Sequence, residues 1–290
     1  MGEARETLNT SISLLDSLLS AMKILSFLLC FTPVVISAQS SAPYWLVGYY
    51  APFEVKSQTP ALIPWTKYTH INHFAVFPNK NCTVDTILIR NQISTFVSAA
   101  HAAGRNALIT LKDRDESPEV FLSCTNSRNI SGFVNNIVSF IKSHNYDGLD
   151  LDWEQVPLFP GRYISRYTDL ISRLRAQMPD KLLTMAVYWN APGHALEEVA
   201  AASQAKLDRV SVMCYDMDGV GKGERVSWYV DALWQAGDVS KSACDAEIDA
   251  FVSRGLAAQK VNVGFPFYGR INPSVTQAGV SRTTLFRTSI

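Results

Sequence analysis

The sequence predicts an α/β fold, an incomplete (β/α)8 barrel of the TIM type in which seven strands are recognisable. Short apolar runs rich in β-branched and aromatic residues alternate with stretches of helical periodicity, which is typical of a parallel sheet covered by helices. Seven such runs at similar spacing favour a barrel over an open sheet. No Gly-x-Gly-x-x-Gly loop follows the first run, which disfavours a dinucleotide-binding fold.

The expected strands are bounded by turn-forming residues and polar stretches. They cover residues 45–50, 68–77, 106–111, 148–153, 182–188, 209–215 and 261–265. The expected helices carry apolar residues at helical spacing, as in the stripe of Phe133, Ile137 and Ile141. They cover residues 86–103, 131–144, 161–178 and 245–258. Only 20 residues follow Arg270 and none forms a strong strand pattern, so we expect the chain to be truncated before an eighth strand.

The N-terminal region has the pattern of a secretory signal peptide. Lys23 precedes an uncharged, mostly apolar run over residues 24–38, and small residues follow at its end. This run of 15 residues is shorter than the roughly 20 that span a bilayer, which disfavours a membrane anchor. We therefore expect residues 1–38 to be a leader, and residues 39–290 to form one secreted domain that is not held at a membrane once the signal is removed.

Export would determine the chemistry of the cysteines and of some asparagines. The cysteines beyond the leader are Cys82, Cys124, Cys214 and Cys244, which allow three pairings. Cys82 and Cys124 both follow strands at the same end of the barrel and are candidates to pair. Cys214 lies in a strand and faces the helix layer, where we expect a buried free thiol. The Asn-x-Ser/Thr tripeptides that would accept glycans begin at Asn81 and Asn129.

The charge balance excludes several classes of partner. Lys and Arg number 26, as do Asp and Glu, so the formal net charge is zero. A chain of this kind is not expected to attract nucleic acid or an anionic membrane surface. Hydrophobic residues at 47% and charged residues at 18% suit a globular domain with a packed core, and we expect a monomer.

The segment Asp-Gly-Leu-Asp-Leu-Asp-Trp-Glu over residues 147–154 concentrates acidic side chains on one strand. Because side chains alternate between the faces of a strand, Asp150, Asp152 and Glu154 share one face, and the apolar residues between them suit the helix layer. Carboxyls about 6.6 Å apart do not all ionise easily, so one should hold a proton, as a general acid requires. A solvated acidic strand and a Ca²⁺ or Mg²⁺ site are the alternatives.

These residues resemble the signature Asp-x-x-Asp-x-Asp-x-Glu of glycoside hydrolase family 18, the chitinases and their relatives. Residues 213–216, Met-Cys-Tyr-Asp, look like the family's Met-x-Tyr-Asp motif, and residues 264–270 look like its seventh-strand motif. The likeness extends over residues 45–270 with the motifs in the expected order. Residues 39–290 would then be the family's catalytic barrel.

The resemblance implies a substrate-assisted retaining mechanism. Glu154 would protonate the glycosidic oxygen while the sugar's own acetamido oxygen attacks the anomeric carbon. Asp152 would orient the acetamido group, Asp150 would tune Asp152 by sharing a proton, and Tyr215 would hydrogen-bond the acetamido group. Such a mechanism needs neither a metal nor an organic cofactor. It restricts the partner to chitin or N-acetylglucosamine oligosaccharides.

Substrate-binding roles are also implied by the resemblance. Asp216 and Arg270 would hold the sugar, and an aromatic residue between the sixth and seventh strands would stack on a sugar ring. Strand-end aromatic residues would line the cleft. The aromatic candidates for these two roles are Trp228, Tyr49 and Phe74.

Two departures from the family pattern leave other functions open. The family's third strand usually ends in Ser-x-Gly-Gly, whereas residues 110–113 read Thr-Leu-Lys-Asp, which changes local packing or substrate fit. The family's eighth strand carries a tryptophan beneath the sugar, and no such strand is recognisable here. A non-catalytic protein that binds chitin or its oligosaccharides and an inactive truncated product are therefore the alternatives to a secreted chitinase.

Overall fold

The computed structural model describes residues 44–54, 59–114, 118–155, 160–188, 194–217, 226–227, 229–235, 242–269 and 277–278. The expected leader over residues 1–38 and the candidate residues Trp228 and Arg270 lie outside this description.

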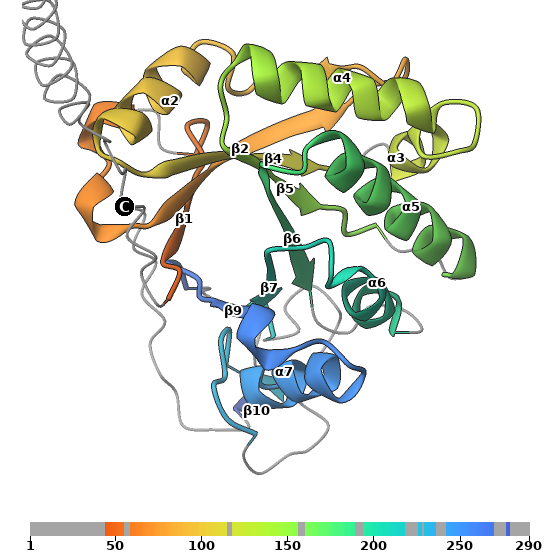
Figure 1. The fold of residues 1–290 in the computed structure, drawn as a ribbon. Helices are drawn as coiled ribbons and strands as arrows, with labels where there is room; N and C mark the ends of the chain where they lie inside the picture. Colours follow the sequence, from red (N-terminus) through yellow and green to blue (C-terminus); the bar gives the residue numbers. More distant parts are fainter. Residues whose placement is uncertain are drawn as a thin grey trace, which may run out of the picture. The chain divides into compact units, whose positions relative to one another are not determined.

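Seven parallel strands form one curled sheet, an incomplete (β/α)8 barrel with helices on its outer side (Figure 1). The ends of each strand differ from the predicted ends by no more than two residues, so all seven predicted strands are confirmed. In spatial order they are β1 (Val47–Tyr50), β2 (His70–Pro78), β4 (Asn106–Lys112), β5 (Gly148–Asp152), β6 (Leu182–Tyr188), β7 (Arg209–Met213) and β9 (Val261–Gly264).

Helices follow most of the strands and cover the outer face of the sheet. Four helices lie where helices were predicted: α2 (Ile93–Ala102), α4 (Ile130–Ser143), α5 (Gly161–Gln177) and α7 (Cys244–Ser253). The predicted ranges were too long for two of them, because α2 begins only at Ile93, after turns over residues 87–92, and α7 ends at Ser253. Two further helices, α3 (Pro118–Cys124) and α6 (Ala195–Ser203), were not predicted. The short elements are η1 (Pro60–Leu62), η2 (Trp65–Lys67), η4 (Ala258–Lys260), β3 (Val84–Asp85), which pairs with β2, and β8 (Val226–Ser227), which pairs with β10 (Gln277–Ala278). Among these described helices, none has the length and apolar character to cross a membrane.

The predicted apolar stripes form the core between sheet and helices. Phe133, Ile137 and Ile141 of α4 are all buried in it. Helix α5 ends at Gln177, just before Pro179, whose ring disfavours helical geometry in the preceding residue. These contacts fix the helix layer against the outer face of the strands.

The outer face of β5 is held by an aromatic cluster. Trp153, just after the strand, is fully buried, stacks on Phe121 with ring centroids 4.4 Å apart, and contacts Tyr163 and Tyr167 of α5. Since Leu149 and Leu151 belong to the same core, the apolar side chains of this segment point to the helices, as predicted.

Two disulfides tie strand ends to helices. Cys82 and Cys124 are bonded, with Cα atoms 5.3 Å apart, which confirms the predicted pairing. The prediction of a free thiol at Cys214 is wrong, because this residue bonds Cys244 with a Cα separation of 5.0 Å. Cys214 does face the helix layer, but Cys244 is the first residue of α7 and brings a second cysteine to that layer.

Candidate active site

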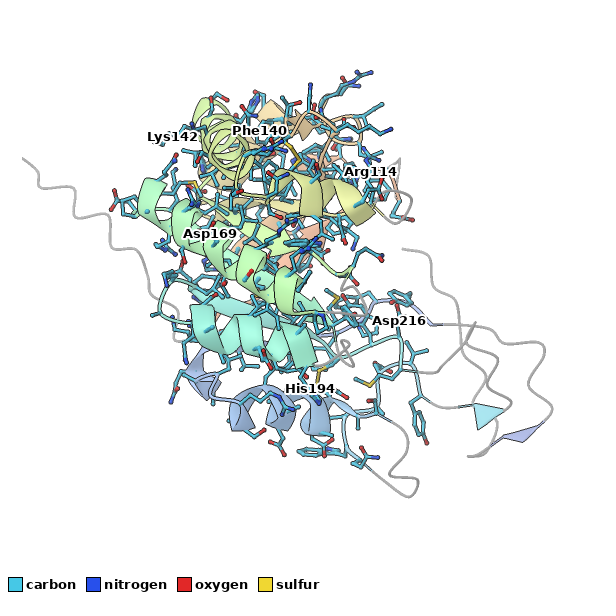
Figure 2. All side chains as sticks on the ribbon, turned by 90° about the vertical axis from the view of Figure 1, so that its right-hand side faces the viewer. Arg114, Phe140, Lys142, Asp169, His194 and Asp216 are labelled. Atoms are coloured by element: carbon cyan, nitrogen blue, oxygen red, sulfur yellow. A yellow bond between two sulfur atoms is a disulfide. The ribbon has the colours of Figure 1, made fainter. Side chains whose placement is uncertain are left out.

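The acidic residues of β5 converge at the end of the sheet where the strands finish. Asp150 and Asp152 are 0% and 4% exposed, and the side chain of Glu154, two residues past the strand, is 29% exposed. Figure 2 shows Arg114, which follows β4, and Asp216, which follows β7, at this same end of the strands. Asp150 and Asp152 therefore lie on the face of β5 that points away from the helices, as predicted.

Three hydroxyl groups donate hydrogen bonds to the carboxylate of Asp150. Thr184 lies 2.5 Å from one carboxylate oxygen, and Tyr49 and Thr110 lie 3.0 and 3.2 Å from the other. Burial raises the pKa of Asp150, and these hydrogen bonds partly offset that rise. The network brings together residues of β1, β4, β5 and β6, and it places the Tyr49 hydroxyl beside Asp150.

Asp152 is the acid with the most strongly raised pKa. Burial is the main cause, and the neighbouring carboxylate of Glu154 adds to it, while Lys112 opposes the rise. Its Oδ2 atom lies 3.3 Å from the Lys112 ammonium, and its buried Oδ1 atom has no hydrogen-bond partner among the described residues. Burial and the neighbouring acid thus favour a proton on Asp152, and its Oδ1 atom keeps an unused hydrogen-bonding position.

Lys112 is a site residue that the sequence prediction missed. It ends β4, directly opposite Asp152 in the parallel register, and its ammonium forms ion pairs with Asp152 and Glu154. Burial alone would lower the pKa of Lys112, but these two carboxylates raise it above its usual value, so the ammonium stays charged. Alternation along β4 places Lys112 on the same face as Thr110, and this signal was available in the sequence.

Asp113 anchors the backbone that carries Glu154. The side chain is 1% exposed, and its two carboxylate oxygens accept hydrogen bonds from the backbone N–H groups of Glu154, at 3.3 Å, and Gln155, at 2.7 Å. Burial raises the pKa of Asp113 to about 6, against these stabilising hydrogen bonds. A buried acid therefore fixes the position of the neighbouring strand end.

Tyrosines border the carboxylates on the β7 side. Burial, followed by the carboxylates of Asp152 and Glu154, raises the pKa of Tyr215. The ring of Tyr268 packs edge-on to that of Tyr215, and the Tyr268 hydroxyl donates a 2.7 Å hydrogen bond to Asp216. Tyr268 lies in the segment that the sequence resemblance singled out, although no role was predicted for it.

Of the remaining candidates for sugar binding, one is described by the structure and two are not. Phe74 on β2 packs edge-on against Tyr49, with ring centroids 6.1 Å apart, which places both aromatic candidates near Asp150. Arg270 and Trp228 are not among the described residues. Within the described ranges, no three His, Cys, Asp or Glu side chains are arranged to hold a metal ion.

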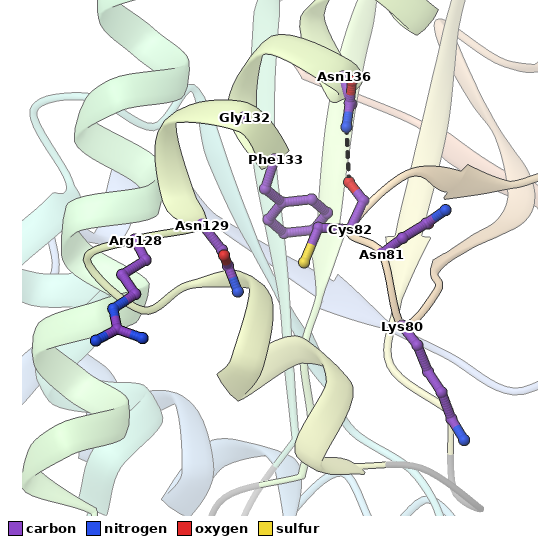
Figure 3. Close-up of a pocket in the computed structure, with 8 residues that line it drawn as sticks. All are labelled: Lys80, Asn81, Cys82, Arg128, Asn129, Gly132, Phe133 and Asn136. Atoms are coloured by element: carbon purple, nitrogen blue, oxygen red, sulfur yellow. Dashed lines mark hydrogen bonds between the residues drawn. The ribbon is translucent and has the colours of Figure 1, made fainter.

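A hollow of about 250 Å³ lies elsewhere, at the start of α4 (Figure 3). Asn136 donates a 2.9 Å hydrogen bond to the carbonyl oxygen of Cys82 across it. It contains no carboxylate, and it includes both predicted glycan acceptors. Its lining residues are Lys80, Asn81, Cys82, Arg128, Asn129, Gly132, Phe133 and Asn136. The acidic residues of β5 therefore lie outside this hollow.

Comparison with known proteins gives a consistent family. The family model described as "Glycosyl hydrolases family 18" matches residues 45–288. The chain is 31% identical over 142 residues to "Probable chitinase 2" of Drosophila melanogaster, covering 48% of this chain and 29% of that protein. It is 24% identical over 270 residues to a chitinase-like effector of Moniliophthora perniciosa, covering 85% and 60%. The chain thus spans less than two thirds of the length of these relatives.

Solved structures share the fold. A mutant of the Ostrinia furnacalis Group II chitinase catalytic domain 2, in complex with a chitooligosaccharide, superposes with a TM-score of 0.68 at 22% identity, covering 78% of this chain and 65% of that one. A chitinase-like agglutinin from Robinia pseudoacacia also gives 0.68, at 21% identity, with 77% and 70% covered. The same fold therefore serves proteins named as enzymes and a protein named as an agglutinin.

Proposed function

Because the chain belongs to glycosyl hydrolases family 18, we propose that it is a secreted glycoside hydrolase that cleaves β-1,4-linked N-acetylglucosamine polymers, that is, chitin or its oligosaccharides. The observation that carries the proposal is the shared inward face of Asp150, Asp152 and Glu154 where β5 ends. In barrels of this type, catalytic groups sit at this end of the strands.

The proposed reaction is retaining and substrate-assisted. Glu154 donates its proton to the glycosidic oxygen, the bond to the anomeric carbon breaks, and the acetamido oxygen of the same sugar forms the new bond, giving a cyclic oxazolinium ion. The Glu154 carboxylate then takes a proton from water as that water attacks the anomeric carbon, and the bond between this carbon and the acetamido oxygen breaks, which restores the acetamido group. The sugar leaves with its original anomeric configuration, and Glu154 regains its proton.

The other residues of the face hold the acetamido group in place for this attack. Asp152 accepts the acetamido N–H, a role supported by its buried Oδ1 atom, which has no partner within the described residues. Asp150 acts through Asp152, and its three hydroxyl donors keep it in one orientation. Tyr215 donates to the acetamido oxygen from the opposite side.

Contacts to the sugar would come from residues around this centre. Asp216, held by Tyr268, would accept hydrogen bonds from sugar hydroxyls, and Arg270 would hold the sugar with it. Aromatic faces would pack on the apolar faces of the pyranose rings. The aromatic residues proposed for this are Tyr49, Phe74 and Trp228.

We further assign residues 1–38 to a leader that is removed on export, and residues 39–290 to the catalytic domain, acting as a monomer. The two disulfides support export, because such bonds persist in oxidising compartments and are rare in the cytosol. The relative from Penicillium expansum named "Secreted chitinase LysM12", 22% identical over 259 residues, points in the same direction.

A second candidate is a sugar-binding protein that does not hydrolyse. The observation that favours it is the ion pair between Lys112 and Glu154, since an acid that is held as a carboxylate does not donate a proton. The agglutinin of Robinia pseudoacacia is a structural neighbour whose name describes binding.

The test is hydrolysis of a fluorogenic chitooligosaccharide by the secreted chain over pH 4 to 8, beside Glu154→Gln. This variant keeps the size of the side chain and removes its proton donor. Turnover that is lost in Glu154→Gln, with binding retained, supports the hydrolase. Binding without turnover in both proteins at every pH supports the sugar-binding protein instead.

A further inference from the structure

Lys112 occupies a position that no role in the proposed reaction requires. Its ammonium contacts Asp152 and Glu154 at once, and the side chain is 19% exposed, so the pairs are largely shielded from solvent. Shielded charges interact more strongly than charges at the surface. Lys112 is therefore a fixed positive charge beside the proton donor.

The register of the sheet makes this contact unavoidable. β4 and β5 run parallel with Thr110 opposite Asp150 and Lys112 opposite Asp152, so the residue at position 112 always faces the acids. Thr110 meets its neighbour with a neutral hydroxyl, 3.2 Å from Asp150. Lys112 places a charged ammonium beside Asp152 and Glu154, so it affects the ionisation of these two carboxyls as well as their position.

An ammonium beside two carboxyls favours the state in which they carry negative charge. Of the two, Asp152 is the more buried and has its pKa raised, so the proton that the pair retains resides on Asp152. Glu154 is the more exposed acid and bonds directly to the ammonium. The ammonium therefore occupies the Glu154 oxygen to which the proton for donation would have to bind.

Other titratable groups also face the two acids. Among the described residues, those that act on Asp152 or Glu154 besides Lys112 are carboxyls and phenols from β5, from β6 and from the segments after β4 and β7. They are Asp113, Asp150, Tyr188 and Tyr215. Only Lys112 therefore supplies a positive charge from this set.

Resting on the hydrolase function proposed above, we propose that Lys112 is a positioning residue that holds Glu154 as a carboxylate and so confines hydrolysis by this chain to acidic pH. Protonation of Glu154 releases it from the ammonium and restores the donor. Near neutral pH the site binds the sugar without cleaving it. The family pattern Ser-x-Gly-Gly has a glycine, which carries no charge, where this chain has Lys112.

The test compares three substitutions in the secreted chain. Lys112→Met removes the charge and keeps the length of the side chain, and Lys112→Arg keeps the charge. Lys142→Met is the matched control, because Lys142 is an exposed lysine of α4 at the opposite end of the strands (Figure 2). Each protein is assayed for kcat/KM on the fluorogenic chitooligosaccharide from pH 4 to 9.

In Lys112→Met, the alkaline limb of the profile should move upward by about one to two pH units, which corresponds to a tenfold to hundredfold gain at pH 7. Lys112→Arg and Lys142→Met should retain the wild-type profile. An unchanged profile in Lys112→Met, with hydrolysis present, overturns the role of Lys112 and leaves the hydrolase intact.

A second readout does not depend on turnover. Protein labelled with ¹³C at the glutamate carboxyl carbons is titrated by NMR, and the Glu154 signal is assigned by its loss in Glu154→Gln. The signal should report a carboxylate in the wild type from pH 8 down to pH 5, and should titrate at higher pH in Lys112→Met. A shift without hydrolysis at any pH supports the role of Lys112 and refutes the hydrolase. A wild-type signal that protonates between pH 8 and pH 5 refutes the role of Lys112, even if Lys112→Met does not fold.

Discussion

The carboxylate of Asp113, at the end of β4, accepts a 2.7 Å hydrogen bond from the backbone N–H of Gln155, at the end of the neighbouring strand. A second bond from the N–H of Glu154 completes the link. The pairing of β4 with β5 ends at Lys112 and Asp152, and the Asp113 side chain continues the connection between the two chain segments beyond that point. The loop that carries the proposed proton donor depends on the ionisation of a residue outside the proposed reaction.

The first prediction concerns pH and stability at Asp113. Its pKa is about 6 in the folded chain against an ordinary value of 3.8, so the folded state binds this proton more tightly than the unfolded state. The associated stability is present below pH 3.8 and is lost as pH rises through about 6. Asp113→Asn removes this dependence, so the free energy of unfolding of the wild type should fall by roughly 2–3 kcal/mol relative to the variant between pH 4 and pH 7.

Urea unfolding at several pH values measures the difference. A constant difference between Asp113→Asn and the wild type over this range would contradict the raised pKa.

The second prediction concerns two glycines with opposite responses to alanine. A Cβ atom on Gly148, in β5, would lie 2.5 Å from the backbone carbonyl oxygen of Leu182, whereas one on Gly132, in α4, would meet nothing within 4 Å. Gly148→Ala should destabilise the fold by about 3 kcal/mol, because the backbone of β6 must move. Gly132→Ala should stabilise it by about 0.5–1 kcal/mol, through helix propensity. Thermal unfolding of the two variants checks both signs.

The third prediction compares two buried tyrosines of α5. Tyr163 donates a 2.5 Å hydrogen bond to the carbonyl of Trp153, and Tyr167 donates a longer one, 3.3 Å, to the carbonyl of Leu151. Tyr163→Phe should cost about 1–3 kcal/mol, because a buried carbonyl loses its donor. Tyr167→Phe should cost less, since its bond is weaker. Equal costs, measured by urea unfolding, would mean that the hydroxyl bonds do not hold the strand end.

The fourth prediction concerns the disulfide between Cys214 and Cys244. It closes a loop with a sequence separation of 30 residues. The double variant Cys214→Ser with Cys244→Ser should lose about 2–4 kcal/mol of stability, mainly because the unfolded chain gains freedom. Peptide mapping without reductant should find the two cysteines in one cross-linked peptide, and free thiols at both positions would contradict the structure.

The strands were predictable because their signal is local. In residues 147–154, alternation alone placed the acids on one face and the leucines on the other, and the structure agrees. Helix α3 is only seven residues long and α6 is rich in alanine, so neither shows a strong apolar stripe. Both were missed for that reason.

Pairings across the fold were less predictable. The departure at residues 110–113 was visible in the sequence, but the contact of Lys112 with Glu154 depends on how β4 and β5 align, which only the packed sheet determines. Likewise, the partner of Cys214 is Cys244, the first residue of α7, at a sequence separation of 30. The spacing of the two cysteines in the sequence did not reveal that they lie side by side in the fold.

The aromatic cluster around Trp153 provides an optical signal beside the proposed site. An indole in such dry surroundings fluoresces at short wavelength, and aromatic neighbours at van der Waals distance make its emission sensitive to small shifts of the strand end. Since the next residue is Glu154, a ligand that displaces this backbone would change the contribution of Trp153 to the emission of the chain's six tryptophans.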